Sequence, residues 1–328
     1  MSMASDVHRL VMQGQRLASE EIAELEETVA GQPADIDTRT KLLGYYFFTG
    51  RQDPDAEQSR QRHVLWLIEN APEAEVMGTP YASMDRILQS DGYEKAKKSW
   101  IKATDDLPES PAVLRNAARY FLLHDRDLSE TLLKRGKRSA PGEPEWCSAL
   151  GQLYSLGLIS LSDGPERTDL AIKSFAEFQS AYNLSSAMER KTLLGSLAKV
   201  AIEAGEIDAA ATYAEEMLQM AETGWDEGNC IHHGNLILGR IALAEGKVED
   251  AKVHLIRAGQ NPGSPQLNSF GPNMVLAKAL MEMGEKEVVL DYFELCGEFW
   301  EMSRGRLTQW ANLVQEDRVP AFGANLAY

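Results

Sequence analysis

The chain has 328 residues, of which 44% are hydrophobic, and its formal net charge is −17. This length is sufficient for two ordinary domains or one long repeat array. A strongly acidic surface repels phosphate backbones and anionic membranes, so the charge argues against nucleic acid and membranes as partners. No apolar stretch approaches the roughly 20 residues needed to cross a bilayer, and the N-terminus lacks a signal-peptide pattern. We therefore expect a soluble, cytoplasmic protein.

The three cysteines, Cys147, Cys230 and Cys296, are widely separated in the sequence. Their number is odd, and no Cys-x-x-Cys pair occurs. This pattern argues against a disulfide framework and against a structural zinc site, and it favours reduced thiols.

Residues 1–35 begin with polar sequence and continue into a helical pattern after Ser19. Ser19 is expected to cap this helix, because its hydroxyl can accept a hydrogen bond from the helix N-terminus and acidic residues follow it. Gly31 and Pro33 end the pattern. We interpret the segment as an N-terminal cap helix.

The next three segments have the pattern of helical hairpins. Residues 36–75 predict two helices joined by a long polar turn. Residues 77–108 predict a weak first helix and a clear second one, and residues 111–141 predict a third hairpin. Pro108 and Pro141 are separated by about 34 residues, which is one period of a known helical repeat.

Four further hairpins are predicted over residues 145–181, 188–221, 229–262 and 272–300. In the last three, a glycine marks the turn between the two helices: Gly205, Gly246 and Gly284. No stretch alternates polar and apolar residues over a useful length, so no sheet is predicted.

Residues 229–262 have the clearest repeat signature. Small or apolar residues recur there at the positions that a helical hairpin repeat needs: Leu238, Gly239, Ala242, Gly246, Ala251, Leu255, Ala258 and Pro262. This pattern resembles the tetratricopeptide repeat (TPR), and the other hairpins look like variations on it. The resemblance implies an all-α fold, namely a right-handed superhelical solenoid of TPR-like hairpins. The chain is also similar to bacterial TPR-containing proteins of undefined function, so no activity carries over.

Small residues in this pattern have a physical role that does not depend on the family. They allow two helices to approach closely, whereas larger residues fill the space between hairpins. The small residues are Gly151, Ala198, Gly239 and Ala277 on first helices, and Ala210 and Ala251 on second helices.

The predicted array covers residues 36–300, in about seven hairpins, and residues 301–328 close it. An amphipathic helix is expected there from the spacing of Leu307, Trp310, Ala311 and Val314. The tail, residues 319–328, is too apolar for a free linker and is expected to pack. The whole chain should behave as one elongated domain.

In TPR arrays, the first helix of each hairpin lines a concave face, and the residue after the small position points into it. Here those residues carry basic or amide side chains: Arg119, Gln152, Lys199, Arg240 and Lys278. With His233 and Asn235 they form the predicted peptide-binding groove, whose charge suits an acidic peptide or a C-terminal carboxylate. The alternative is that they are ordinary solvated residues paired with neighbouring acids.

Cys230, His232, His233 and His254 are of types that bind metals. Adjacent histidines on a helix point about 100° apart, so one ion cannot easily use both. No accepted ligand spacing is met either. We therefore expect no metal and no cofactor, with the cysteine packed and the histidines capping a helix or lining the groove.

No catalytic motif of the GxSxG, HExxH, P-loop or dinucleotide-binding type occurs. Adjacent carboxylates are numerous, but an acidic chain contains many such pairs by chance. Trp225 lies in an acidic loop, where it either anchors a partner or seals a junction between repeats.

These observations favour a non-catalytic scaffold that binds an extended peptide of another protein in its concave groove. One alternative is a self-associating structural module whose groove is filled by the chain's own residues 319–328. A second alternative is an enzyme whose active-site residues are scattered over the solenoid. The identity of the partner and the oligomeric state are not encoded in a recognisable motif.

Overall fold

The computed structural model describes residues 4–222, 224 and 226–326. Within these ranges the chain forms helices and turns, and no strand occurs, so the predicted all-α fold is confirmed. Consecutive helices pack against each other, as a helical repeat requires. Trp225 and the last two tail residues, Ala327 and Tyr328, lie outside the described residues.

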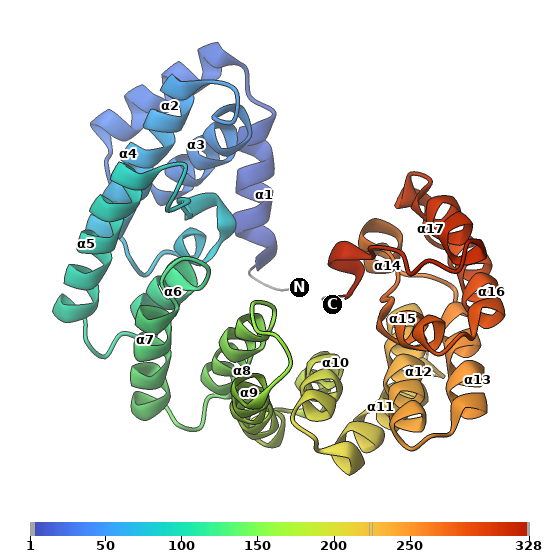
Figure 1. Ribbon diagram of the computed structural model, residues 1–328. Coiled ribbons are helices and arrows are strands. Elements are labelled where there is room, and N and C mark those ends of the chain that lie inside the picture. The colour runs from blue at the N-terminus through green and yellow to red at the C-terminus, as the bar shows by residue number, and fades with distance from the viewer. Residues whose placement is uncertain (1–3, 223, 225, 327–328) are drawn as a thin grey trace. The chain divides into compact units, whose positions relative to one another are not determined.

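The helices group into two compact units, Met1–Trp146 and Cys147–Tyr328, and the division falls within one helix. The predicted limits of the cap segments, near residues 35 and 300, remain predictions. The helices of the first unit are α1 (Ala4–Gln15), α2 (Ser19–Gly31), α3 (Ile36–Thr49), α4 (Pro54–Asn70), η1 (Glu75–Gly78), η2 (Pro80–Ala82), α5 (Ser90–Asp106), α6 (Pro111–Phe121) and α7 (Arg126–Ser139) (Figure 1).

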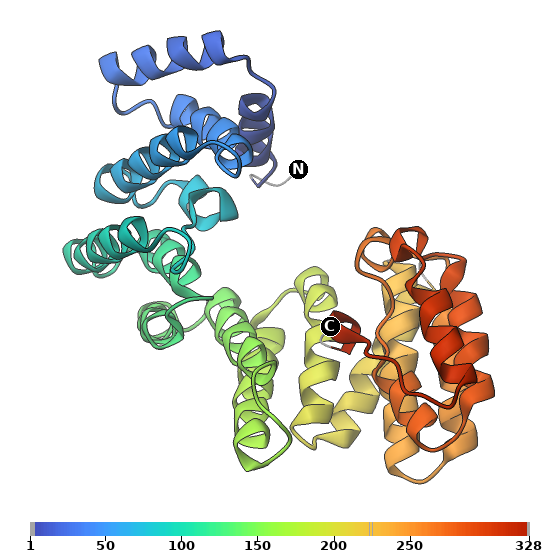
Figure 2. The same ribbon diagram turned by 45° about the horizontal axis from the view of Figure 1, so that its top comes forward.

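Helix α1 was not predicted, because its sequence is mostly polar. It nevertheless packs along α3 (Figure 2), with Leu10 and Val11 buried. The two backbones approach closely where each helix has a glycine. A Cβ atom on Gly14 would lie 1.8 Å from the carbonyl oxygen of Lys41, and one on Gly44 would lie 2.2 Å from that of Val11.

Three details of the first unit correct the sequence predictions. Ser19 does not cap α2, because it is already the first helical residue; instead the Glu21 carboxylate accepts a hydrogen bond from the Ala18 backbone N–H at 2.8 Å. The turn before α4 is short rather than long, since Asp53 caps α4 directly. The weak first half of the segment at 77–108 is not an α-helix and contributes only the short η1 and η2.

A polar network joins α2, α3 and α4 in the first unit. The Arg39 guanidinium donates to Nδ1 of His63 at 3.0 Å, so the hydrogen on Nε2 of His63 is donated to Glu26, at 2.9 Å. The hydroxyl of Tyr46 also donates to Glu26, at 2.6 Å. The hydrogen bond from His63, with a smaller contribution from Tyr46, lowers the pKa of Glu26 to about 2 despite its partial burial.

We expect Glu26→Gln to destabilise the first unit by about 2 kcal/mol at pH 7, after discounting for partial exposure. The Glu26 pKa is depressed on folding, so its contribution is fully present above the unfolded value of 4.5 and is lost as the pH falls towards 2. Urea unfolding at pH 7 and at pH 3 measures this difference. A variant whose deficit at pH 3 is as large as at pH 7 would contradict the assignment.

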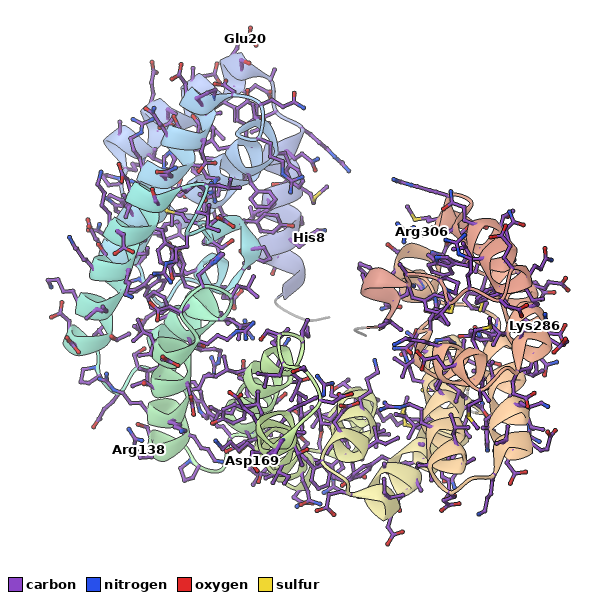
Figure 3. The ribbon with its side chains drawn as sticks, viewed as in Figure 1. His8, Glu20, Arg138, Asp169, Lys286 and Arg306 are labelled. Atoms are coloured by element: carbon purple, nitrogen blue, oxygen red, sulfur yellow. The ribbon has the colours of Figure 1, made fainter. Side chains whose placement is uncertain are left out.

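The second unit repeats one type of hairpin along most of its length. Its elements are α8 (Pro144–Leu158), α9 (Pro165–Leu184), α10 (Ala187–Glu203), α11 (Ile207–Ala221), α12 (Glu227–Ala244), α13 (Val248–Gly259), α14 (Pro265–Phe270), α15 (Val275–Glu282), α16 (Lys286–Gly297), η3 (Glu301–Ser303), α17 (Arg306–Gln315) and η4 (Gly323–Leu326) (Figure 1). Exposed charged residues such as Arg138 in the first unit and Asp169 in the second cover the solvent-facing sides of the helices (Figure 3).

Glycines form the predicted turns of three hairpins. Gly205, Gly246 and Gly284 have φ values of 79°, 76° and 88°, a left-handed conformation that favours glycine. After α10, the N–H of Glu206 donates to the carbonyl of Ala201 at 2.9 Å, which is the hydrogen bond of a Schellman helix end. Equivalent bonds close the other two turns. These hairpin assignments are therefore confirmed.

Close helix packing occurs where the sequence has its small residues. A Cβ on Gly151 would lie 2.7 Å from the Phe178 ring, and one on Gly239 would lie 2.4 Å from a methyl of Leu276. Ala198 and the other predicted small alanines are fully buried. Any larger side chain at these positions would push two helices apart.

The end of the chain packs onto the second unit, as predicted for the part of the tail that is described. Trp310 of α17 is buried, and its ring centroid lies 5.0 Å from that of Phe322 in the tail. The carbonyl of Asn325 accepts from the Met274 N–H at 2.8 Å, and its amide donates to two carbonyls of the loop before α15, at 2.8 and 3.2 Å. The tail is thereby fixed beside the start of α15.

Candidate functional site

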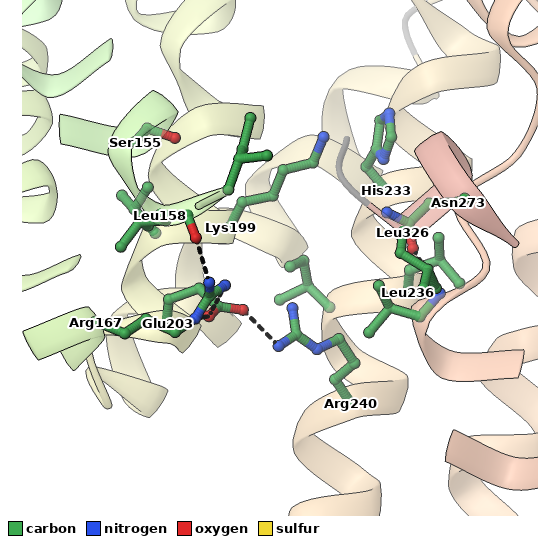
Figure 4. Close-up of a pocket in the computed structure, with 15 residues that line it drawn as sticks. Ser155, Leu158, Arg167, Lys199, Glu203, His233, Leu236, Arg240, Asn273 and Leu326 are labelled. Atoms are coloured by element: carbon green, nitrogen blue, oxygen red, sulfur yellow. Dashed lines mark hydrogen bonds and ion pairs between the residues drawn. The ribbon is translucent and has the colours of Figure 1, made fainter. Parts of the chain in front are cut away.

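The second unit contains a pocket of about 400 Å³ on the side formed by the first helices of its hairpins (Figure 4). Helices α8, α10 and α12 contribute its walls, together with the start of α15 and the tail. The lining residues are Ser155, Leu158, Ile159, Arg167, Lys199, Val200, Glu203, His233, Leu236, Ile237, Arg240, Asn273, Val275, Gly323 and Leu326. The pocket thus lies on the side of the second unit that its first helices form.

A carboxylate between two arginines forms the floor of the pocket (Figure 4). Arg240 donates to one oxygen of Glu203 at 2.8 Å, and Arg167 donates to the other at 2.8 and 3.1 Å. Arg167 also donates to the carbonyl of Leu158 at 2.6 Å, so it is fully engaged in structural contacts. Arg240 also lines the pocket, and it has no other hydrogen-bonding or ionic partner among residues 4–222, 224 and 226–326.

The charge state of Glu203 follows from these contacts. Burial alone raises the pKa of Glu203, but the hydrogen bonds and positive charges of Arg240 and Arg167 outweigh it, and the net pKa lies below the usual value. Glu203 is therefore a carboxylate at neutral pH. Its single negative charge lies between two guanidinium groups and cannot neutralise both. The pocket therefore carries an excess of positive charge.

Lys199 is the third cation of the pocket. Its side chain extends from α10 towards His233 (Figure 4), and it makes no hydrogen bond or ion pair with any described residue. Burial lowers the pKa of its ammonium group to about 8, because desolvation disfavours the charged form. Lys199 is thus mostly charged at pH 7 and is available to a ligand.

The neighbouring histidines have different roles, as their divergent directions on a helix predict. His232 is fully buried; its Nε2 accepts from the Asn273 N–H at 3.1 Å, so its Nδ1–H donates to the carbonyl of Ala258 at 3.1 Å. Burial lowers the pKa of His232 to about 4. His233 lines the pocket, and burial together with the Lys199 charge lowers its pKa well below the usual value. Both imidazoles are neutral at pH 7.

The geometry gives no support to a metal site at these residues. Both nitrogens of His232 are occupied, and burial raises the pKa of the Cys230 thiol to about 11. His254 pairs instead with the Asn235 amide oxygen, at 3.0 Å between that oxygen and Nδ1. Across the described part of the chain, no group of three or more His, Cys, Asp or Glu residues is placed to hold an ion.

Three of the predicted groove residues lie together in the pocket: Lys199, His233 and Arg240. Asn235 does not, because it is buried and its amide bonds to the Ile231 carbonyl and to His254 between α12 and α13. Gln152 is exposed but does not line the pocket. Lys278 lies outside it and pairs with Glu282 at 3.5 Å.

Arg119 belongs to the first unit and lines a separate pocket of about 800 Å³. There it pairs with Glu145 at 3.2 Å, and Arg115 contacts the other oxygen of that carboxylate at 2.9 Å. Two more glutamates, Glu73 and Glu75, line the same pocket. The acidic residues offset the arginines, so Arg119 does not create an anion site.

Sequence reasoning missed two parts of the pocket. Glu203 and Arg167 were not predicted, although Glu203 is four residues after Lys199 and so falls on the same face of α10. The tail residues Gly323 and Leu326 were expected to pack, but their position at the pocket follows only from the tertiary contacts of Asn325.

No described helix is both long and apolar enough to cross a membrane. Neither a comparison with models of known protein families nor a comparison with curated proteins finds a match. The likeness to TPR proteins therefore rests on the repeat pattern and on the packing of the helical hairpins.

Proposed function

We propose that the chain is a non-catalytic, TPR-like scaffold, with right-handed stacking of its hairpins, that binds a carboxylate-bearing peptide segment of another protein. The observation that carries this proposal is the charge of the pocket in the second unit. It holds three cationic side chains and one carboxylate, although the whole chain has a net charge of −17. A peptide carboxylate is the ligand group that best complements this excess of positive charge.

The unengaged donors define where that carboxylate would lie. Lys199 and Arg240 line the same pocket as the neutral imidazole of His233, and Arg240 uses only one terminal nitrogen for Glu203. Hydrogen bonds to charged groups contribute about 1.5–3 kcal/mol each. Apolar side chains such as Val200 and Leu236 adjoin this point, so an aliphatic residue next to the carboxylate would be buried as well.

This proposal predicts that the protein enriches peptides from a random hexapeptide library with free carboxyl termini, and that amidation abolishes the enrichment. The alternative is that the pocket binds an acidic side chain, and enrichment of amidated peptides rich in Asp or Glu would show that this is the anchoring group.

Fluorescence anisotropy with the selected peptide tests the pocket residues. Lys199→Met and Arg240→Met should each weaken peptide binding by about 10- to 100-fold. Lys278→Met and Arg119→Met are controls of equal charge change and should leave the affinity within about twofold. Equal losses in all four variants would refute the pocket assignment.

The same titration has a predicted pH dependence. Burial lowers the pKa of Lys199 to about 8, so its charge, and with it part of the affinity, is lost as the pH rises from 7 to 9. Arginine keeps its charge over this range, so Lys199→Arg should bind with little pH dependence. A wild-type protein whose affinity is constant from pH 7 to pH 9 would contradict this role for Lys199.

A second candidate is that the chain's own tail serves as the pocket's occupant. Its support is that Gly323 and Leu326 are part of the lining. Truncation of residues 326–328 in the same anisotropy experiment separates the two candidates. A tail that competes with the peptide gives higher affinity when it is removed, whereas a tail that forms part of the binding wall gives lower affinity.

A further inference from the structure

Lys199 is partly buried and lacks a partner among the residues that the structure describes, and binding a carboxylate by charge alone does not require this combination. Its amine is partly buried in the pocket, and it has no hydrogen-bonding or ionic partner within the described residues. The other two cations of the pocket differ, because Arg167 and Arg240 are tied to Glu203. A lysine that is held without a counter-ion in a partly apolar site has more free amine near neutral pH than an exposed lysine, although the charged form still dominates at pH 7, and the free amine is the nucleophilic form.

We infer that the Lys199 amine captures the carbonyl group of a small 2-oxo acid as an imine, while Arg240 holds the carboxylate of that acid. This goes beyond peptide binding, and it rests on the proposed function only for the carboxylate contact at Arg240. A pocket of about 400 Å³ is within the range of small-molecule sites, about 300–1,000 Å³.

The chemistry needs no oxidant, reductant or metal. The lone pair of Nζ forms a bond to the carbonyl carbon, and the carbonyl π electrons move to oxygen, which takes up a proton. Nitrogen gives up one proton in exchange for the one that oxygen took, which produces a neutral carbinolamine. The hydroxyl group then leaves with the remaining nitrogen-bound proton as water, and a C=N bond replaces the C–O bond. His233 lines the same pocket, and the Lys199 side chain extends towards it (Figure 4), so its neutral imidazole can relay a proton from nitrogen to oxygen.

The choice of a 2-oxo acid follows from the position of the free arginine donors. Lys199 and Arg240 line one pocket from neighbouring first helices, α10 and α12, and Arg240 uses one terminal nitrogen for Glu203, which leaves its other N–H groups without a partner among the described residues. In a 2-oxo acid the carboxylate is bonded directly to the carbonyl carbon. One small molecule can therefore satisfy the amine and the guanidinium together, whereas a neutral ketone contacts only the amine.

Reductive trapping tests this inference. The full-length protein is incubated at pH 7.5 with pyruvate and sodium cyanoborohydride, which reduces an imine to a stable secondary amine, and modified lysines are mapped by peptide mass spectrometry. Lys247 is the internal control, because its pairing with Glu245 raises its pKa. Lys199 should be labelled at least about tenfold faster than Lys247. Equal labelling of the two lysines would overturn the inference.

Two further arms test the ligand class. Acetone lacks the carboxylate and should label Lys199 more slowly than pyruvate does, and Arg240→Met should slow labelling by pyruvate but not by acetone. Acetone that labels Lys199 as fast as pyruvate would overturn the assignment to a 2-oxo acid. Lys199→Arg, checked for an unchanged melting temperature, should lose the adduct. Peptide anisotropy on the same samples shows whether a failure concerns this inference alone or the carboxylate site as well.

Discussion

Replacing His232 with alanine should lower the free energy of unfolding of the second unit by about 3–5 kcal/mol. The imidazole is fully buried and joins three segments, because it bonds to the Ala258 carbonyl and to the Asn273 N–H. The substitution removes this volume and leaves both backbone groups without their partner. Hydrogen exchange should show the loss as faster exchange in α12, α13 and the start of α15.

The same residue predicts an acid transition. The folded pKa of His232 is about 4, below the unfolded value of 6.5, so folding favours the neutral form. Its contribution is therefore present above pH 6.5 and is lost as the pH falls from 6.5 towards 4. In His232→Ala this part of the pH dependence should be missing.

His233 provides the matched control for this prediction. It is the next residue on α12, but its side chain lines the pocket. It makes no hydrogen bond with any described residue, so its replacement leaves no backbone group without a partner. We expect His233→Ala to cost less than about half as much as His232→Ala. Equal effects of the two substitutions would show that His232 has no special structural role.

Gly44→Ala should destabilise the first unit by about 2–4 kcal/mol, although alanine normally favours a helix by about 1 kcal/mol over glycine. A Cβ at this position would lie 2.2 Å from the Val11 carbonyl oxygen, so α1 has to move away from α3. Moving α1 exposes Leu10 and Val11, which are now buried. Thermal unfolding and limited proteolysis of α1 measure the effect.

Gly31→Ala is the control for this substitution. Gly31 ends α2, and a Cβ there would have no neighbour within 4 Å. Its effect on stability should lie within about 0.5 kcal/mol of zero. A Gly44→Ala protein as stable as Gly31→Ala would mean that α1 does not pack on α3 as described.

The hairpins of the second unit could be predicted from the sequence because their signals are local. Gly205 and Gly246 fix turns by their own backbone conformation, and Gly239 fixes a close helix contact by its size. Helix α1 could not be predicted in this way. Its apolar residues Val7, Leu10 and Val11 share one face but span little more than one turn, so their stabilisation comes from packing on α3.

The pocket was predictable only in part, for a similar reason. Lys199 and Arg240 follow small repeat positions, so the periodic pattern placed them on the presented face. Asn235 was assigned to the groove as a hydrogen-bonding residue, but it is buried, and its amide oxygen pairs with His254 on the partner helix. The salt bridge from Glu203 to Arg167 joins different hairpins, and such pairings depend on a tertiary register that spacing within one hairpin does not encode.

The most direct test of the carboxylate-binding pocket is a methyl NMR titration with the peptide selected from the library. We predict that shifts are confined to pocket methyl groups such as those of Val200, Leu236 and Leu326, and that the amidated peptide does not cause them. Ile87 and Leu88 of the first unit are 85% and 84% exposed and serve as a control surface. Shifts at Ile87 and Leu88, or identical shifts with the free and amidated peptides, would contradict the account.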